Sequence, residues 1–143
     1  MQPPIIIYRI SHFFFLLYLK PISFIFDYLN RLIFRCWIPG SAKIGKGFSV
    51  GYWGIGVVIH SNSVIGNYCQ VNQNVTIGRK MTEPGVPTLG DHVYIGANSV
   101  ILGNISIGNN TIIGALSLVN KDIPANCFAA GIPAVIIRKI ENE

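Results

Sequence analysis

Aliphatic residues recur at every sixth position over the second half of the chain. Steps of six from Ile59 to Val119 meet ten aliphatic residues in eleven positions, and Glu83 is the exception. A six-residue unit is too short for a strand plus a helix, so each unit predicts a short strand and a corner, with three units to one triangular coil. Stacked coils bury the aliphatic ladder and pair each strand with its neighbours. We therefore expect residues 39–143 to form an all-β, parallel β-helix.

Two features interrupt this period. The segment GYWGIGVVI, residues 51–59, holds three residues more than the period allows. The second interruption lies between Gly78 and Leu89, where GRKMTEPGVPT is rich in turn formers and charges and predicts a protruding loop. Interruptions of a repeat array tend to gather on one face and to carry function, so we expect both to lie on one functional face of the β-helix.

The first 38 residues follow a different pattern. They form an aromatic and aliphatic segment in which Pro21 predicts a break between two helices. The longest uncharged run, the ten residues between Arg9 and Lys20, is well short of the ~20 residues that cross a bilayer as a helix. Apolar bulk with scattered charges favours helices in a membrane interface. The alternative is that residues 1–38 cap the β-helix.

The net charge of +5 arises within residues 1–46, which hold six basic residues and one acidic residue. These basic residues lie among Phe, Ile and Leu rather than on a polar face with exposed aromatic rings, so we expect no nucleic-acid partner. Anionic lipids attract such a segment. Half of the residues are hydrophobic and 12% are charged, which also indicates a partner surface, either a membrane or other subunits.

The cysteines Cys36, Cys69 and Cys127 are odd in number and lack metal-ligand spacing, so neither a disulfide framework nor a zinc site is predicted. This usage fits a reducing cytoplasm. Met1 is followed by no charged n-region and no small-residue cleavage site, so a cleaved signal peptide is not expected. The expected location is the cytoplasm, peripheral on the inner face of the cytoplasmic membrane.

Four stretches carry a resemblance to a known family: IPGSAKIGKGFSV, VVIHSNSVIGNYCQVNQNVTIG, VPTLGDHVYIGANSVILGNISIGNNTIIGALSLVNKDIP and AAGIPAVIIRK. They are similar to the serine acetyltransferase and sugar O-acetyltransferase group of hexapeptide-repeat acyltransferases, over about residues 38–139. The resemblance implies a left-handed β-helix, a homotrimer with active sites between subunits, and acetyl-CoA as cosubstrate without a metal.

Carried over by position, the resemblance also implies a CoA site. Ala97 and Ala115 fall where the family's backbone meets the pantetheine arm, and Asn120, Lys121 and Arg138 fall where it meets the nucleotide end. A corner with a minimal side chain lets backbone amides approach a thin ligand, and Lys and Arg suit phosphates. The alternative for Lys121 and Arg138 is ordinary solvated charge.

O-acetylation needs a base for the acceptor's proton, and histidine is the usual choice. The family's catalytic histidine would fall where this chain has Trp53, and a second one corresponds to about Val86. His60 at a coil corner is then the predicted catalytic base, with a structural corner residue as the alternative. His92 is expected to be a solvated corner residue, and His12 a helix residue that could reach a cleft.

The predicted function is an acetyl-CoA-dependent O-acetyltransferase acting on a sugar hydroxyl of a polysaccharide or lipid-linked glycan precursor. This acceptor is chosen because the N-terminal segment has the composition of a membrane-surface segment. A serine O-acetyltransferase is one alternative. A non-catalytic trimeric scaffold that has lost the family base is another, since Trp53 and Val86 replace the histidines. A γ-type carbonic anhydrase would need three zinc-binding histidines, and the β-helix holds two.

Overall fold

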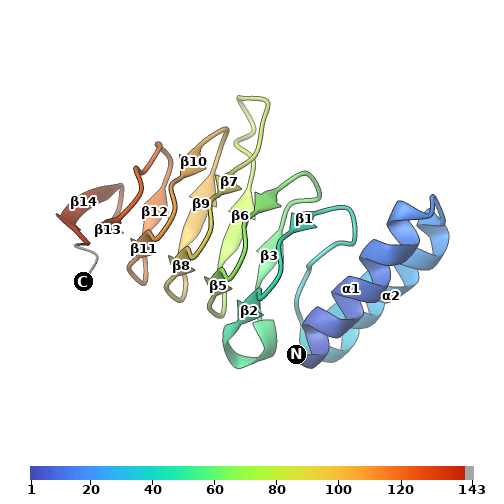
Figure 1. Ribbon diagram of the computed structural model, residues 1–143. Coiled ribbons are helices and arrows are strands. Elements are labelled where there is room, and N and C mark those ends of the chain that lie inside the picture. Colours follow the sequence, from blue (N-terminus) through green and yellow to red (C-terminus); the bar gives the residue numbers. More distant parts are fainter. Residues whose placement is uncertain (141–143) are drawn as a thin grey trace.

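The computed structural model describes residues 1–140 and shows two helices followed by a column of short strands (Figure 1). Helix α1 spans Pro3–Leu16 and α2 spans Lys20–Phe34, so the predicted break at Pro21 is confirmed. Pro21 lies in the first turn of α2, where its missing N–H has no helical partner to lose. The strands of the column are β1 (Lys43–Ile44), β2 (Ser49–Val50), β3 (Val58–Ile59), β4 (Val64–Ile65), β5 (Gln70–Val71), β6 (Thr76–Gly78), β7 (Thr88–Leu89), β8 (Tyr94–Ile95), β9 (Val100–Leu102), β10 (Ser106–Ile107), β11 (Ile112–Ile113), β12 (Leu118–Val119), β13 (Cys127–Gly131) and β14 (Ala134–Lys139).

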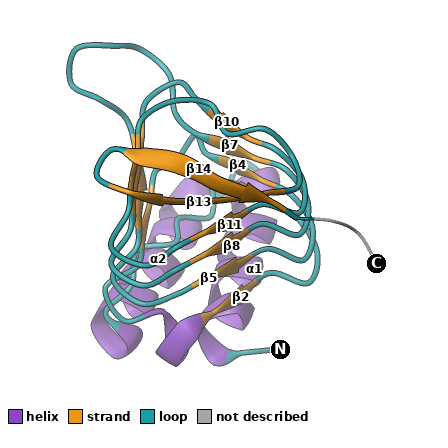
Figure 2. Cartoon of the chain, turned by 90° about the vertical axis from the view of Figure 1, so that its left-hand side faces the viewer, coloured by secondary structure: helices purple, strands orange, loops and turns teal. Residues whose placement is uncertain are grey.

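Three sheets form the faces of the column, and Figure 2 shows the strands of one of them stacked above each other. The sheets have the orders β1-β4-β7-β10, β2-β5-β8-β11-β13-β14 and β3-β6-β9-β12, which makes four full coils. Each strand pairs in parallel with the strand one coil further on, as Val71 does with Ile95. The exception is β14, which pairs antiparallel with β13. The parallel β-helix expected from the six-residue period is confirmed, as is the helix pair before it.

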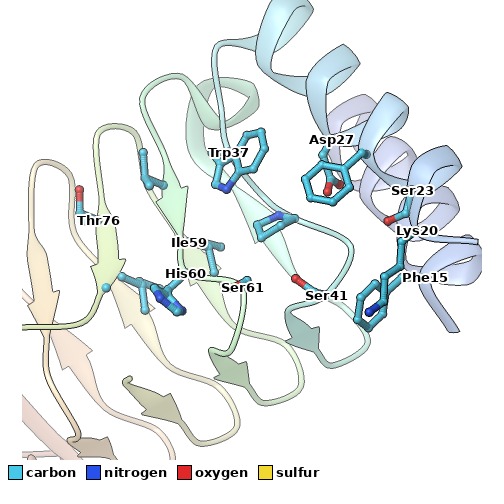
Figure 3. Close-up of a pocket in the computed structure, with 15 residues that line it drawn as sticks. Phe15, Lys20, Ser23, Asp27, Trp37, Ser41, Ile59, His60, Ser61 and Thr76 are labelled. Atoms are coloured by element: carbon cyan, nitrogen blue, oxygen red, sulfur yellow. The ribbon is translucent and has the colours of Figure 1, made fainter. Parts of the chain in front are cut away.

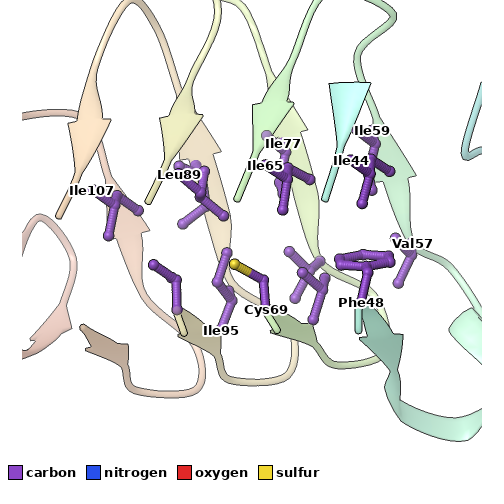
Figure 4. Packing of buried hydrophobic residues seen from close by; sticks show 14 of the residues in the cluster. Ile44, Phe48, Val57, Ile59, Ile65, Cys69, Ile77, Leu89, Ile95 and Ile107 are labelled. Carbon is purple, nitrogen blue, oxygen red and sulfur yellow. The ribbon is translucent and has the colours of Figure 1, made fainter. Parts of the chain in front are cut away.

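The aliphatic ladder forms the core of the column (Figure 4). Ile77 and Ile95 are fully buried, and the small residues two positions before a ladder residue, such as Val75 and Ser99, are buried as well. The Ser99 hydroxyl donates to the Gly114 carbonyl at 2.9 Å, so this buried polar group is paired. Each fully buried aliphatic side chain contributes about 1.5 to 3 kcal/mol, which makes the ladder the main source of stability.

The corners between the sheets form three edges, which we name after one residue of each. The His60 edge joins the β3 sheet to the β1 sheet and carries residues 60–63, 79–87, 103–105 and 120–122. The Ala97 edge joins the β2 sheet to the β3 sheet and carries residues 51–57, 72–75, 96–99 and 114–117. The His92 edge joins the β1 sheet to the β2 sheet and carries residues 45–48, 66–69, 90–93 and 108–111.

The two interruptions of the period lie on different edges. The extra residues at the Ala97 edge form an irregular 3₁₀ turn, Gly51–Gly54, before β3. Residues 79–87 form the predicted loop on the His60 edge, between β6 and β7, and this loop stands out from the column in Figure 1. The expectation that both interruptions gather on one face is therefore wrong.

Helix α1 covers the open end of the first coil and pairs its backbone groups. The Tyr8 hydroxyl donates to the Ala42 carbonyl at 2.8 Å and accepts from the Ile44 N–H at 3.2 Å. Burial raises the pKa of Tyr8 to about 12, so the hydroxyl keeps its proton at neutral pH. The Gln2 amide donates to the Val50 carbonyl and accepts from the Val50 N–H, both at 2.8 Å. The end of a solenoid is an unpaired edge, and this cover protects it.

Asp27 of α2 joins both helices to the β-helix. Its Oδ1 accepts from the Ser11 hydroxyl at 2.6 Å and from the Gly40 N–H at 2.9 Å, and the residue is 5% exposed. Burial raises the pKa of Asp27, and these two hydrogen bonds oppose the rise. Gly40 is required here, because a Cβ at this position would lie 2.2 Å from the Ser11 Oγ.

The boundary between the two parts is short. Trp37 already pairs in parallel with Val58 of β3, three residues after the end of α2. The division into residues 1–38 and 39–143 stays a prediction, and its last three residues lie outside the described range. Within residues 1–140, no helix has the length and apolar character needed to cross a membrane.

Candidate functional site

A pocket of about 410 Å³ lies between the helix pair and the first two coils of the β-helix (Figure 3). It combines aromatic and aliphatic walls with a lysine, a carboxylate, an imidazole and several hydroxyls, a composition typical of small-molecule sites. The lining residues are Phe15, Lys20, Ser23, Phe24 and Asp27 from the helices, Trp37, Pro39 and Ser41 from the connection, and Val58, Ile59, His60, Ser61, Thr76, Ile77 and Gly78 from the β-helix.

His60, the predicted catalytic base, lines the β-helix wall of this pocket, directly after β3. Its backbone N–H donates to the Ile77 carbonyl at 2.8 Å, which holds the corner in place. Its Nδ1 accepts from the Asn62 N–H at 3.1 Å. Because this contact uses the Nδ1 lone pair, the neutral ring carries its hydrogen on Nε2. In this geometry Nε2 is a hydrogen-bond donor, whereas a general base needs a free lone pair there.

His12 has the complementary arrangement. Its Nδ1 lies 2.6 Å from the Gly40 carbonyl oxygen, which can only accept, so the hydrogen is on Nδ1 and the Nε2 lone pair is free. The ring stacks on Tyr8 with centroids 5.6 Å apart. His12 is not among the residues that line the pocket. His60 therefore has the position of a catalytic residue, and His12 has the tautomer of a base.

The two positions where the resemblance expects histidine are separated in the structure. Trp53 lies in the Gly51–Gly54 turn of the Ala97 edge, and its ring packs edge-on against Phe34 of α2 with centroids 5.9 Å apart. Val86 is half-buried in the loop on the His60 edge. His60 follows the Trp53 turn in sequence, but β3 places the two residues on different edges.

The five predicted CoA-binding residues do not converge within one chain. Ala97 and Ala115 are stacked on the Ala97 edge, where the N–H of Leu116 donates to the Ala97 carbonyl at 2.9 Å. Arg138 of β14 lies with its guanidinium 5.7 Å from the centre of the Phe128 ring. Asn120 and Lys121 follow β12 and lie on the His60 edge, on the other side of the β3 sheet.

The remaining candidates for chemistry lie apart from the pocket. His92 is exposed on the His92 edge and stacks on Tyr68 with centroids 5.2 Å apart, as expected of a corner residue. The three cysteines are buried and free, and burial raises the pKa of Cys36 to about 11, so its thiol keeps its proton. No cluster of three His, Cys, Asp or Glu side chains that could hold a metal ion occurs in the described part of the chain.

The helical wall of the pocket was not predicted from the sequence. Ser23, Asp27 and Asn30 are polar residues spaced for one face of an otherwise apolar helix, and all three are buried in the structure. That spacing was the available signal, because polar residues on one helix face share a partner surface. Lys20 and Thr76 carried no such signal, since folding alone brings them to one pocket.

Comparisons with known proteins agree with this architecture. The family model "Bacterial transferase hexapeptide (six repeats)" matches residues 87–121. A serine acetyltransferase of Synechococcus elongatus is 36% identical over 135 residues, which are 93% of this chain and 55% of the relative. Serine acetyltransferase 2 of Arabidopsis thaliana is 41% identical over 113 residues, which are 78% of this chain and 35% of the relative. The chain thus spans about half, or less, of the length of these curated relatives.

Solved structures show the same likeness. The serine acetyltransferase of Neisseria gonorrhoeae is 33% identical with a TM-score of 0.91, over 98% of this chain and 54% of that chain. The serine acetyltransferase of Brucella abortus in complex with coenzyme A is 28% identical with a TM-score of 0.90, over 97% of this chain and 56% of that chain. Both alignments include nearly all of this chain, so they extend over the helix pair as well as the β-helix.

The chain belongs to the hexapeptide-repeat transferases, and the fold class inferred from its sequence is confirmed. The particular proteins that it is similar to are serine acetyltransferases. These comparisons favour the serine alternative over the sugar or glycan acceptor predicted from the sequence, and they give no support to a role in polysaccharide biosynthesis.

Proposed function

We propose that this protein is an acetyl-CoA-dependent O-acetyltransferase with the hydroxyl of serine as acceptor. The observation that carries the proposal is the likeness to serine acetyltransferases over 93% of the chain in sequence and 97% in structure, the latter in a complex with coenzyme A. The likeness extends to the helix pair, so it includes both walls of the His60 pocket. The proposed donor, acetyl-CoA, is compatible with the cytoplasmic location expected from the sequence, which stays a prediction.

In the proposed reaction the serine hydroxyl oxygen attacks the carbonyl carbon of the acetyl thioester. A carbon–oxygen bond forms, the carbon–sulfur bond breaks, and the hydroxyl proton leaves by way of a protein side chain to the departing CoA sulfur. The products are O-acetylserine and CoA. The protein has to hold two substrates in line, take up a proton and stabilise the negative charge on the thioester oxygen.

His60 is the side chain that we propose for the acceptor end, because it lines the pocket and the β-helix offers no other histidine there. As a donor, its Nε2–H stabilises the oxyanion. As a base, it must first move its hydrogen to Nδ1, which breaks the contact with the Asn62 N–H. The assignment of His60 as general base stays a prediction, and substitutions that keep one ability and remove the other decide it.

We propose that the donor binds between copies of the chain in a homotrimer. Ala97 and Ala115 lie on one edge and Asn120 and Lys121 on another, so one copy presents two halves of a CoA site in different directions. A closed cyclic assembly brings one edge of each copy to the other edge of its neighbour. Lys121 and Arg138 are then free to bind the phosphates of the nucleotide end.

The direct test is CoA release from acetyl-CoA by the purified chain, with serine, with a glycan precursor and without an acceptor. The proposal predicts release that depends on serine and yields O-acetylserine by mass spectrometry. Release that depends on the glycan precursor would show that the acceptor is a sugar. CoA binding by calorimetry without any acceptor-dependent release would leave a trimeric scaffold that has lost the family base.

A further inference from the structure

Helix α2 is amphipathic in the reverse of the usual sense. Its buried residues are polar: Ser23, Asp27 and Asn30. Six of its exposed residues are large and apolar, in three adjacent pairs one helical turn apart, which places them on one stripe. This outer face of α2 consists of Phe24, Ile25, Tyr28, Leu29, Leu32 and Ile33.

Polar contacts fix this orientation, so the helix cannot turn to bury its apolar side. The Ser11 hydroxyl lies 2.8 Å from the Ser23 hydroxyl and donates to Asp27. The Asn30 amide donates to the Pro4 carbonyl at 2.9 Å. Rotating α2 would break these hydrogen bonds and separate the polar groups from their partners, which is unfavourable for buried groups. The outer face is therefore a stable feature of the fold.

The apolar surface continues into the turn between the helices. Leu16, Leu17 and Tyr18 are exposed there, and Tyr18 is 87% exposed. Contiguous apolar surface of this kind marks an interaction site on a folded protein. Tyr18 and Tyr28 are amphipathic rings of the type that lie at membrane–water interfaces.

The charge around the outer face has one sign. Lys20, Arg31 and Arg35 are exposed, whereas Asp27, the one acidic residue among residues 1–46, is buried and faces inward. A second copy of the same face would bring like charges together, which disfavours a symmetric contact between helix pairs. An anionic lipid surface complements both the apolar stripe and the positive charge.

We propose that the outer face of α2, with the α1–α2 turn, holds the protein on an anionic membrane surface. The helices lie in the interface and do not cross it, since neither is long enough to span. The proposal concerns location and goes beyond acetyl transfer. Phe24 belongs both to the wall of the His60 pocket and to the groove on the outer face, so the pocket opens beside the proposed membrane contact.

The test is co-sedimentation of the full chain with phosphatidylcholine vesicles, with and without 30 mol% phosphatidylglycerol. We expect binding to the anionic vesicles that weakens as salt is raised. Leu32→Asp, at a position 71% exposed, should lower the partition coefficient roughly tenfold or more, because one apolar anchor is lost and a repelled charge is added. Met81→Asp, at a fully exposed apolar residue of the 79–87 loop, is the matched control and should bind as the wild type does.

Substitutions that remove positive charge provide an independent test of the same proposal. Arg31→Gln and Arg35→Gln should each lower the binding roughly fivefold, because each removes one positive charge near the anionic surface. Wild-type binding to neither vesicle, or equal binding by Leu32→Asp, would overturn the proposal. So would a wild type that ignores vesicles and forms assemblies larger than a trimer in light scattering, if Leu32→Asp reduces them to trimers, because the outer face would then be a protein interface.

Discussion

The β-helix and the helix pair place their apolar residues on opposite sides. In the β-helix the aliphatic ladder is buried and the corners carry Asn, Asp and Gly. In α2 the buried residues are Ser23, Asp27 and Asn30, and large aromatic and aliphatic residues are exposed. The contrast shows that burial selects for paired groups as well as apolar ones, because Ser23 and Asp27 are both hydrogen-bonded. It also shows that the apolar side of a helix need not face the core of its own chain.

The largest effect is expected where the two regions meet, at His60. His60→Ala should lower the rate of acetyl transfer by about 10² to 10⁴, because a positioned catalytic group is lost, while CoA binding and the trimer persist. His60→Gln separates the two roles, since glutamine can donate a hydrogen bond but cannot take up a proton. Turnover in His60→Gln close to the wild type would identify a donor, and loss equal to that of His60→Ala would identify a base.

A control keeps this test specific to chemistry. The His60 ring also holds a corner, because its Nδ1 accepts from the Asn62 N–H, so a lower melting temperature in both variants together with lost activity would make it a structural residue. If activity is retained in both variants, His12 becomes the candidate base, because its Nε2 lone pair is free. His12→Gln should then lower the rate of acetyl transfer.

The core of the β-helix provides the next prediction. Ile95→Ala should lower the free energy of unfolding by about 2 to 5 kcal/mol, because it opens a cavity in a fully buried ladder. Gln70→Ala, at an outward position of the neighbouring strand β5, should change it by less than about 0.5 kcal/mol. Chemical denaturation measures both. Equal effects would mean that the ladder is not the source of stability.

The six-residue period could predict the column, its core and its protruding loop, because each depends on local spacing. It could not predict the pocket, since Lys20 and His60 line the same pocket only after the helices fold back over the first coils. The usual rule also puts the apolar face of a helix inward, and α2 breaks it. The two roles weighed for residues 1–38 turn out to be compatible, because α1 caps the first coil while α2 leaves an apolar face exposed. The tautomer of His60 depends on the Asn62 N–H and is invisible in sequence.

Donor binding tests the far end of the β-helix. Arg138→Ala should weaken CoA binding by about 1.5 to 3 kcal/mol if its guanidinium binds a phosphate, and Lys121→Ala by a similar amount. Lys139→Ala, the next residue of β14, is the matched control and should bind CoA as the wild type does. Calorimetric affinities that are unchanged in Arg138→Ala would remove this residue from the site.

The smallest effect is expected at the polar junction of the helix pair. The raised pKa of Asp27 means that the folded state holds this proton more tightly than the unfolded state. The contribution of Asp27 to the free energy of unfolding therefore grows as the pH falls through the raised pKa, and it is complete below the ordinary pKa of 3.8. Asp27→Asn keeps an acceptor for Ser11 and Gly40, so its stability at neutral pH should stay within about 1 kcal/mol of the wild type. The difference between the two proteins should shift in favour of the wild type as pH falls, and a constant difference would contradict this role.

We assign acetyl transfer to the pocket and the β-helix, and binding to the membrane surface to the outer face of α2. The most direct test of that division is serine-dependent CoA release by Ile25→Asp/Leu32→Asp, a variant with both changes on the outer face and none in the pocket. We expect this variant to release CoA at the wild-type rate in solution and to lose its binding to anionic vesicles. No serine-dependent release by the wild type, or its loss in this variant while the fold and the trimer persist, would contradict this assignment.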